Sequence, residues 1–282
     1  MNELNKAYLN QYAIPQFNMN GTIWMETILK TAEECQSPVI VGTTDKIVEN
    51  LGGFRFIASS FKILKEELNI TIPAILHLDH GQSVESCYMA VDAGYDSVMF
   101  DGSSLPIEEN IKKTQQVVKY AHAHNVTVEA EVGSVGGTED GMTSNLMYAD
   151  LEECLQIIQE TGVDSLAPAL GSVHGRYQGE PNLGFEEMEQ LRESTDTPFV
   201  LHGASGISNS DLTKAIELGH AKINYNTEVN IAWSNALREV LNENPLLYSP
   251  MDILGPSKKA MAEVMKKIFK RTKSFNQSVT VY

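Results

Sequence analysis

The runs Ala74–His80 (AILHLDH) and Ser97–Ser103 (SVMFDGS) decide the fold class of this chain. Each is a short apolar stretch that ends in small or polar residues, as is typical of a strand buried in a parallel sheet. Six more runs have the same character: YAIPQFN from Tyr12, PVIVGTT from Pro38, TVEAEVG from Thr127, SLAPALG from Ser165, PFVLHGA from Pro198 and AKINYNT from Ala221. Their starts lie 23 to 38 residues apart, which leaves room for a helix between successive strands.

The segments between these runs show helical periodicity, for example Ile107–His124 and Asp211–Leu218. Eight strand–helix units predict an α/β fold, the closed parallel (β/α)8 or TIM barrel, as one domain over residues 1–282. An open doubly wound sheet is the alternative, but no glycine-rich dinucleotide fingerprint follows the first run. A last helix is expected over Ser257–Arg271, followed by a polar tail.

The charge and composition of the chain exclude several classes of protein. With 21 basic and 37 acidic residues in 282, the net charge is −16, which argues against nucleic acid as a partner. No stretch is apolar enough to cross a membrane, and the first residues lack a signal core, so we expect a cytoplasmic protein. Three widely spaced cysteines, Cys35, Cys87 and Cys154, predict buried free thiols rather than disulfides.

Three of the seven histidines lie at or just after predicted strand ends: His80, His174 and His202. Barrel enzymes carry their chemistry at the carboxyl ends of the strands, so these imidazoles are expected to converge. One such histidine alone would more often be a hydrogen-bonded structural residue. Three imidazoles with one open position are typical of a catalytic zinc site. His77 is interpreted as a packed strand residue, and His122, His124 and His220 as surface or capping residues.

Carboxylates accompany these histidines. Asp79 precedes His80, and the two can share a site only if the strand is ending there, which Gly81 would permit. Asp79 is then a candidate metal ligand, ligand orienter or proton acceptor. Asp101, Glu129 and Glu131 are candidates to orient ligands or to make structural hydrogen bonds.

Glycine-rich and hydroxyl-rich loops follow the last predicted strands. Gly171, Ser172 and Gly175, the run Gly203–Gly206 and the run Asn224–Thr227 offer backbone amides and small donors for an anion, as phosphate sites of barrels do. The run Gly133–Gly141 has four glycines and two carboxylates. It is either a flexible surface loop or a mobile lid that carries an acid or base.

Six motifs in this order resemble the class II, metal-dependent ketose-bisphosphate aldolases. They are LHLDHG (76–81), VEAEVGSVGGTEDG (128–141), APALGSVHG (167–175), GEPNLGF (179–185), VLHGASGI (200–207) and AKINYNTE (221–228). The resemblance implies reversible cleavage of a phosphorylated ketose into dihydroxyacetone phosphate and an aldehyde. It implies zinc bound by His80, His174 and His202, with Glu131 at a second metal or monovalent cation position.

The resemblance also implies residue roles and partners. Asp79 would exchange a proton with the substrate C4 hydroxyl, and Glu139 would move the proton at C3 of dihydroxyacetone phosphate. The ketose phosphate would be bound by Gly175, Gly203, Ala204, Ser205, Asn224, Tyr225, Asn226 and Thr227. The expected partners are a small sugar phosphate and a second copy of the chain in a homodimer or homotetramer, with no nucleic acid and no membrane.

Two residues depart from the fructose bisphosphate enzymes of the family. Gln178 stands where HGxYKGEP has lysine, and Asn230 stands where some members have arginine. Both departures argue against a second substrate phosphate, while Arg176 is a candidate for contact with a carboxylate, a phosphate or only solvent. The candidate substrates are fructose 1,6-bisphosphate, 6-phospho-5-dehydro-2-deoxygluconate of inositol catabolism and tagatose 1,6-bisphosphate. The remaining alternative is a non-catalytic barrel that binds a sugar phosphate. Such a protein would lack part of the set formed by the three histidines, Asp79 and Glu139.

Overall fold

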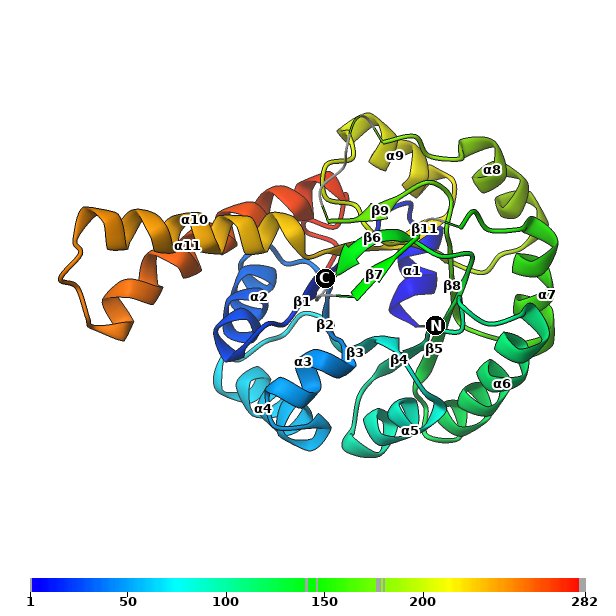
Figure 1. Ribbon diagram of the computed structural model, residues 1–282, viewed down its shortest axis with the longest axis horizontal. Coiled ribbons are helices and arrows are strands. Elements are labelled where there is room, and N and C mark those ends of the chain that lie inside the picture. The colour runs from blue at the N-terminus through cyan, green and yellow to red at the C-terminus, as the bar shows by residue number, and fades with distance from the viewer. Residues whose placement is uncertain (1, 140–141, 146, 176–178, 180, 279–282) are drawn as a thin grey trace.

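The computed structural model describes residues 2–278, apart from 140–141, 146, 176–178 and 180. Eight parallel strands close into a barrel in the order β1-β11-β10-β8-β5-β4-β3-β2 (Figure 1). Their bounds are β1 Ile14–Asn18, β2 Val39–Thr43, β3 Ala74–Gly81, β4 Ser97–Phe100, β5 Thr127–Val132, β8 Ser165–Pro168, β10 Phe199–Leu201 and β11 His220–Tyr225. The predicted (β/α)8 barrel is confirmed, and the open doubly wound sheet is wrong.

Helices surround the barrel and connect successive strands (Figure 1). They are α1 Glu3–Leu9, α2 Thr22–Glu34, α3 Asp45–Asn50, α4 Phe54–Glu67, α5 Val84–Ala93, α6 Ile107–Ala123, α7 Leu151–Thr161, α8 Phe185–Ser194, α9 Asn209–Glu217, α10 Thr227–Glu243 and α11 Pro250–Arg271. Side chains of Thr44, Ser83, Asp150 and Ser208 accept hydrogen bonds from first-turn amides and so fix where four of the helices begin.

The main hydrophobic core lies between the barrel and its helices. Strand residues such as Leu76, Val98 and Ile223 are fully buried there. Burial on both faces explains why these strands read as continuous apolar runs instead of alternating ones. The polar residues within them, which face the barrel interior, are therefore the exceptions that mark the site.

A second, three-stranded sheet lies over one end of the barrel in the order β7-β6-β9. Its strands are β6 Gly136–Glu139, β7 Met142–Ser144 and β9 Val173–His174. Four of the nine residues of the glycine-rich run 133–141 thus belong to strand β6, where the sequence predicted a flexible loop or a mobile lid. Residues 140 and 141 lie outside the described part of the chain, as do the side chains of 138, 139 and 142–144.

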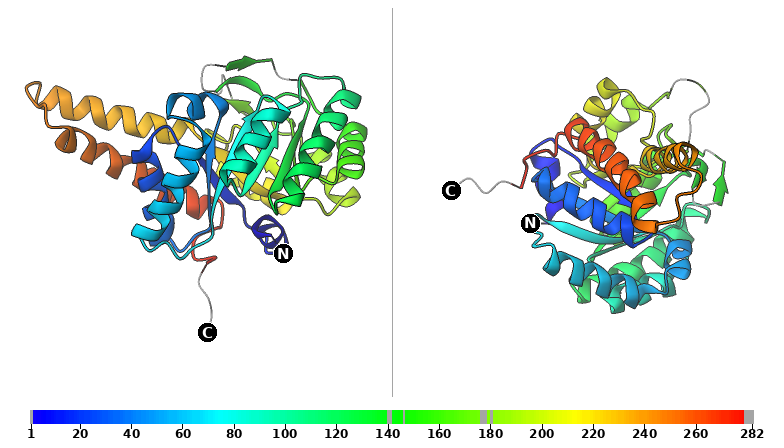
Figure 2. Two further views of the ribbon diagram at one scale, coloured as in Figure 1. Left: turned by 90° about the horizontal axis from the view of Figure 1, so that it is seen from below. Right: turned by 90° about the vertical axis from the view of Figure 1, so that its left-hand side faces the viewer.

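Helices α10 and α11 form an antiparallel arm that extends beyond the barrel (Figures 1 and 2). Helix α11 begins at Pro250 rather than at the predicted Ser257, because Pro256 lies inside the helix instead of starting it. The first residues of the tail pack against the barrel, where Asn276 N donates to Cys35 O at 3.0 Å. Within the described residues, no helix combines the length and the apolar character that a membrane crossing requires.

Candidate active site

The three predicted histidines come together at the carboxyl end of the barrel. His80 is the last residue but one of β3, His174 ends β9 and His202 follows β10. Their ring centroids are 4.7 Å apart for His80 and His202, 5.3 Å for His80 and His174, and 5.8 Å for His174 and His202. One nitrogen of each ring lies within 4.8 Å of a nitrogen of the other two. Three side chains from distant parts of the sequence therefore form one donor set.

Backbone conformation at His80 allows two neighbouring residues to enter the site. His80 has a φ of 49°, in the left-handed region that non-glycine residues rarely adopt. The register between β3 and β4 shifts between Leu78 and Gly81. The sequence suggested that the strand would end at His80. Strand β3 instead continues through His80 to Gly81, with an irregularity in its pairing. This irregularity directs both Asp79 and His80 toward the barrel axis.

Carboxylates orient two of the imidazoles. His80 Nδ1 lies 2.8 Å from Asp101 Oδ2, and His202 Nε2 lies 3.0 Å from Glu129 Oε1. The remaining nitrogens, His80 Nε2 and His202 Nδ1, face each other at 2.9 Å. Carboxylates that bind the second nitrogen of a histidine fix its ring and tautomer, which is the usual arrangement around metal-binding imidazoles.

Below the imidazoles, a buried lysine pairs with one of these carboxylates. Lys222 Nζ donates to Glu129 Oε2 at 2.5 Å and lies 3.1 Å from His77 Nε2. Burial would raise the pKa of Glu129, but the charge of Lys222 holds it well below its usual range. Burial and Lys222 together lower the pKa of His77 to about 3, so this imidazole is neutral. His77 is packed and hydrogen-bonded, as predicted.

The carboxylates act in opposition to burial at His80. Burial alone would lower the pKa of His80, yet Asp79, Asp101 and Glu131 raise it well above its usual value. Burial and the charge of Asp101 raise the pKa of Glu131. Glu131 Oε2 is buried without a hydrogen-bond partner in the described part of the structure, 3.7 Å from His202 Nδ1. An orphaned buried oxygen beside three imidazoles fits a divalent cation.

Asp79 occupies a fixed position beside this cluster. Its side chain is fully buried and accepts hydrogen bonds from Gln16 Nε2 at 2.7 Å and from Asn224 Nδ2 at 3.3 Å. These two amide donors hold the carboxyl group in one orientation. Asp79 is therefore placed to accept a proton from a hydroxyl group held near the imidazoles.

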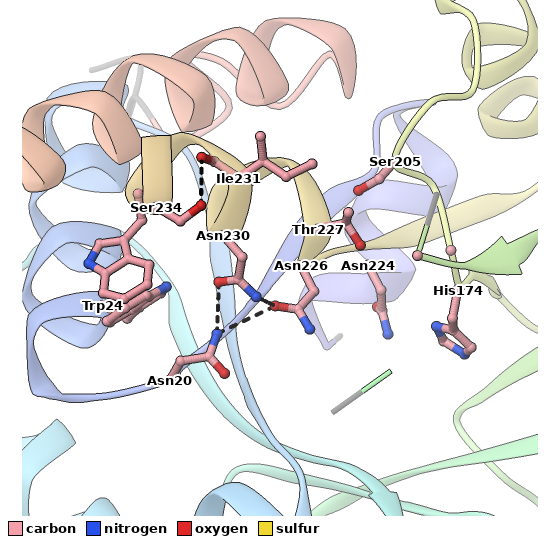
Figure 3. A pocket seen from close by; sticks show the side chains of 13 residues that line it. Asn20, Trp24, His174, Ser205, Asn224, Asn226, Thr227, Asn230, Ile231 and Ser234 are labelled. Atoms are coloured by element: carbon pink, nitrogen blue, oxygen red, sulfur yellow. Dashed lines mark hydrogen bonds between the residues drawn. The ribbon is translucent and has the colours of Figure 1, made fainter. Parts of the chain in front are cut away.

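A cavity of about 580 Å³ opens beside His174 (Figure 3). Of the residues expected to bind a ketose phosphate, six line it: Gly175, Gly203, Ser205, Asn224, Asn226 and Thr227. Helix α10 begins at Thr227, and its N-cap residue Asn226 makes no side-chain hydrogen bond to the helix amides. Of the first amides of α10, that of Glu228 donates to Ser205 Oγ at 3.4 Å. The N-terminus of a helix is suited to a phosphate group. Ala204 and Tyr225 are fully buried and do not line the cavity.

Three amide side chains form the wall of this cavity opposite His174 (Figure 3). Asn20 Nδ2 donates to Asn230 Oδ1 at 3.0 Å and to Asn226 Oδ1 at 3.4 Å. Asn230 Nδ2 donates to Asn226 Oδ1 at 2.6 Å. Asn230, which sequence comparison placed at the far end of the substrate, is thus part of a fixed and uncharged wall.

Some predicted residues cannot be placed. Glu139 belongs to β6, but its side chain lies outside the described part, and Arg176 and Gln178 lie outside it entirely. The backbone of β6 does reach the site, since Gly137 pairs with His174.

Sequence reasoning missed Gln16, Lys222 and Asn20 as site residues. The sequence does contain a signal for Gln16 and Lys222, because each is a polar residue inside an otherwise apolar buried run. His220 was also misjudged as a surface residue: it is buried in β11, although its Nδ1 does cap α9 at Ala215 O (2.9 Å).

A closed (β/α)8 barrel with a convergent histidine and carboxylate cluster beside a cavity at a helix N-terminus is typical of metal-dependent barrel enzymes. Residues 1–277 match the family model described as "Fructose-bisphosphate aldolase class-II". The chain belongs to this family, whose members are metal-dependent, and it is an aldolase, an aldehyde-lyase.

Relatives carry two different substrate names. The chain is 54% identical over 263 residues to 6-phospho-5-dehydro-2-deoxy-D-gluconate aldolase of Bacillus subtilis, covering 93% of this chain and 91% of the relative. It is 50% identical over 259 residues to fructose-bisphosphate aldolase of Geobacillus stearothermophilus, covering 92% and 90%. The crystal structure of the YdjI aldolase of Escherichia coli K12 matches with a TM-score of 0.85 at 34% identity, covering 98% of this chain and 97% of that one.

Proposed function

We propose that this aldolase cleaves 6-phospho-5-dehydro-2-deoxygluconate into dihydroxyacetone phosphate and malonic semialdehyde. The observation that carries this proposal is the wall of amide side chains formed by Asn20, Asn226 and Asn230 at the end of the cavity distant from His174. This wall suits a singly charged carboxylate better than a second, doubly charged phosphate, because it offers no guanidinium group. Asn230 stands where the resemblance gives some fructose bisphosphate enzymes an arginine. The relatives that carry the proposed substrate name are 52% to 54% identical to the chain.

We further propose zinc as the metal, held by His80, His174 and His202. Three imidazoles, two of which have a carboxylate on their other ring nitrogen, are a donor set typical of catalytic zinc. Glu131, buried with one oxygen lacking a hydrogen-bond partner in the described structure, is the candidate for a second metal or monovalent cation. When bound, the metal would act as a Lewis acid toward the negative charge that develops on the ketose during cleavage.

Proton transfer and phosphate binding are assigned to residues of the chain itself. Asp79, held in position by Gln16 and Asn224, accepts the proton of the hydroxyl on the carbon that becomes the aldehyde. The carbon–carbon bond electrons then pass to the dihydroxyacetone phosphate half. Gly203, Ser205 and the first amides of α10 hold its phosphate. Glu139 is proposed to return a proton to the cleaved carbon.

Fructose 1,6-bisphosphate is the second candidate substrate, because relatives with that name are 48% to 50% identical over most of the chain. Tagatose 1,6-bisphosphate stands third. The three differ in the group at the far end of the molecule, which is a carboxylate in the first and a phosphate in the other two.

Kinetics with the three substrates test the proposal directly. Release of dihydroxyacetone phosphate is measured for each at matched zinc concentration, and kcat/KM is compared. The highest value is expected for 6-phospho-5-dehydro-2-deoxygluconate. A higher kcat/KM for either bisphosphate overturns the substrate assignment. Cleavage that a chelator does not inhibit overturns the proposal that the enzyme needs a metal.

We also propose that the enzyme is cytoplasmic and forms a homodimer or homotetramer through the α10–α11 arm. The three cysteines are free and buried, as expected for a reducing compartment. Large apolar side chains gather at the arm tip, where Leu246, Tyr248 and Met251 are 88%, 91% and 80% exposed. Such a patch is typical of a surface that another chain covers.

A further inference from the structure

A second, smaller cavity adjoins the substrate cavity. It has a volume of about 270 Å³ and is lined by Asn20, Lys46, Ile47, Asn50 and Leu51. Asn20 lines both cavities, so they meet at its side chain. The hydrogen bonds of Asn20 to Asn226 and Asn230 fix this common wall.

The two cavities differ in charge. The described residues that line the larger one include no lysine or arginine. The nearby barrel mouth carries the carboxylates of Asp79, Asp101 and Glu131. A substrate with an anionic group at each end would have its phosphate bound by backbone amides, but its other anion would meet neutral amides and carboxylates. A cation is therefore needed at the second end, and Lys46 lines the adjoining cavity.

The order of the strands places Lys46 at the correct end of the substrate. The phosphate-binding residues follow β9, β10 and β11, whereas Asn20 follows β1 and Lys46 follows β2. Strand β2 lies next to β3, which carries Asp79. Because Asp79 is proposed to accept the proton of the hydroxyl of the aldehyde half, that half is expected to extend toward β2 and away from the phosphate loops.

Helix α3, which carries Lys46, is anchored on both sides. Thr44 Oγ1 accepts from Ile47 N at 3.3 Å and fixes the start of the helix. Asp45 Oδ2 accepts from Gln82 N at 2.9 Å, and its other oxygen accepts from the hydroxyl of Ser86. The backbone that carries Lys46 is thus held at the barrel mouth, and the exposed side chain of Lys46 lines the smaller cavity.

We propose that Lys46 binds the anionic group at the aldehyde end of the substrate and so determines which aldehyde the enzyme releases or accepts. The group is the carboxylate of malonic semialdehyde if the proposed function holds, on which this inference rests, and a phosphate if the substrate is a bisphosphate. Lys46 acts on specificity through ion pairing and takes no part in bond cleavage.

The test uses the condensation direction, in which dihydroxyacetone phosphate stays constant and the aldehyde is varied. Wild type, Lys46→Met and Lys46→Arg are assayed with malonic semialdehyde, glyceraldehyde 3-phosphate and uncharged propanal. Lys46→Met is expected to lower kcat/KM about tenfold or more for the anionic aldehyde that wild type prefers, and less than about twofold for propanal. Lys46→Arg is expected to restore most of the loss. Lys62→Met removes an exposed lysine of α4 and serves as the matched control.

The outcomes separate this inference from the proposed function. Equal loss with propanal and with the anionic aldehyde, or no loss with either, overturns the role of Lys46. Preference for glyceraldehyde 3-phosphate with a selective loss in Lys46→Met supports Lys46 but overturns the proposed substrate. If propanal is too poor an acceptor, exchange of the C3 proton of dihydroxyacetone phosphate in deuterated water replaces it as the reference reaction. Wild type that neither exchanges nor condenses refutes the proposed function itself.

Discussion

At the scale of single residues, the left-handed backbone of His80 decides how the site is built. On a regular strand Asp79 and His80 would point to opposite faces. The φ of 49° at His80 and the shifted register with β4 bring both into the barrel mouth. A proton acceptor and a metal ligand thus come from adjacent positions, and both are held by hydrogen bonds from other strands.

Replacing Asp79 by alanine is expected to lower turnover by about two orders of magnitude or more while zinc stays bound, because the imidazole donors are unchanged. Turnover and zinc content per chain are measured together. Asp79→Asn is the matched control, since it keeps the volume but removes the proton acceptor, and it should be equally impaired. Near-normal turnover in either variant would contradict the role of Asp79.

His220 gives the fold a pH dependence that is independent of the site. Burial lowers its pKa from 6.5 to about 4, so the unfolded chain binds a proton that the folded chain does not. Its contribution to stability is full above pH 6.5 and is lost as the pH falls toward 4, at up to about 1.4 kcal/mol per pH unit. His220→Asn should flatten the free energy of unfolding across this window in denaturant titrations. An unchanged slope would show that His220 titrates normally.

At the scale of elements, the small sheet β7-β6-β9 connects the glycine-rich run after β5 to His174. Gly137 has a φ of 103°, and a Cβ atom there would lie 2.1 Å from the carbonyl oxygen of His174. Only glycine permits this approach of β6 to β9. The sheet thereby positions one imidazole and, further along β6, the backbone of Glu139.

Gly137→Ala is expected to displace β6 from His174 and to reduce both turnover and zinc affinity, with the barrel still folded. Zinc titration and far-ultraviolet circular dichroism distinguish this result from unfolding. Gly255→Ala in α11, where a Cβ would meet nothing within 4 Å, is the control and should keep normal activity. Normal zinc affinity in Gly137→Ala would refute the positioning role of β6.

At the scale of the whole molecule, the α10–α11 arm has two ends with different surroundings. The barrel end of α10 lines the substrate cavity through Asn230, Ile231 and Ser234, while the far end exposes apolar side chains. The arm therefore connects the site to the surface proposed for a second copy.

Changing Leu246, Tyr248 and Met251 together to serine is expected to shift the protein from an oligomer to a monomer, because the apolar surface that drives association is lost. Analytical ultracentrifugation measures the mass of both proteins over a range of concentrations. Leu9→Ser, which removes an exposed leucine of α1, a helix outside the arm, is the control. An unchanged mass in the triple variant would exclude the arm tip as the interface.

The sequence by itself determined the eight strands, their closure into a barrel and the meeting of three histidines. It could do so because buried parallel strands are continuous apolar runs and because their carboxyl ends share one edge. Only the tertiary structure decided that Lys222 neutralises Glu129, that Gln16 holds Asp79 and that Asn20 joins two cavities. A local pattern reports which residues are buried but not which buried residues face each other across a barrel, and these contacts depend on the closure of the whole sheet.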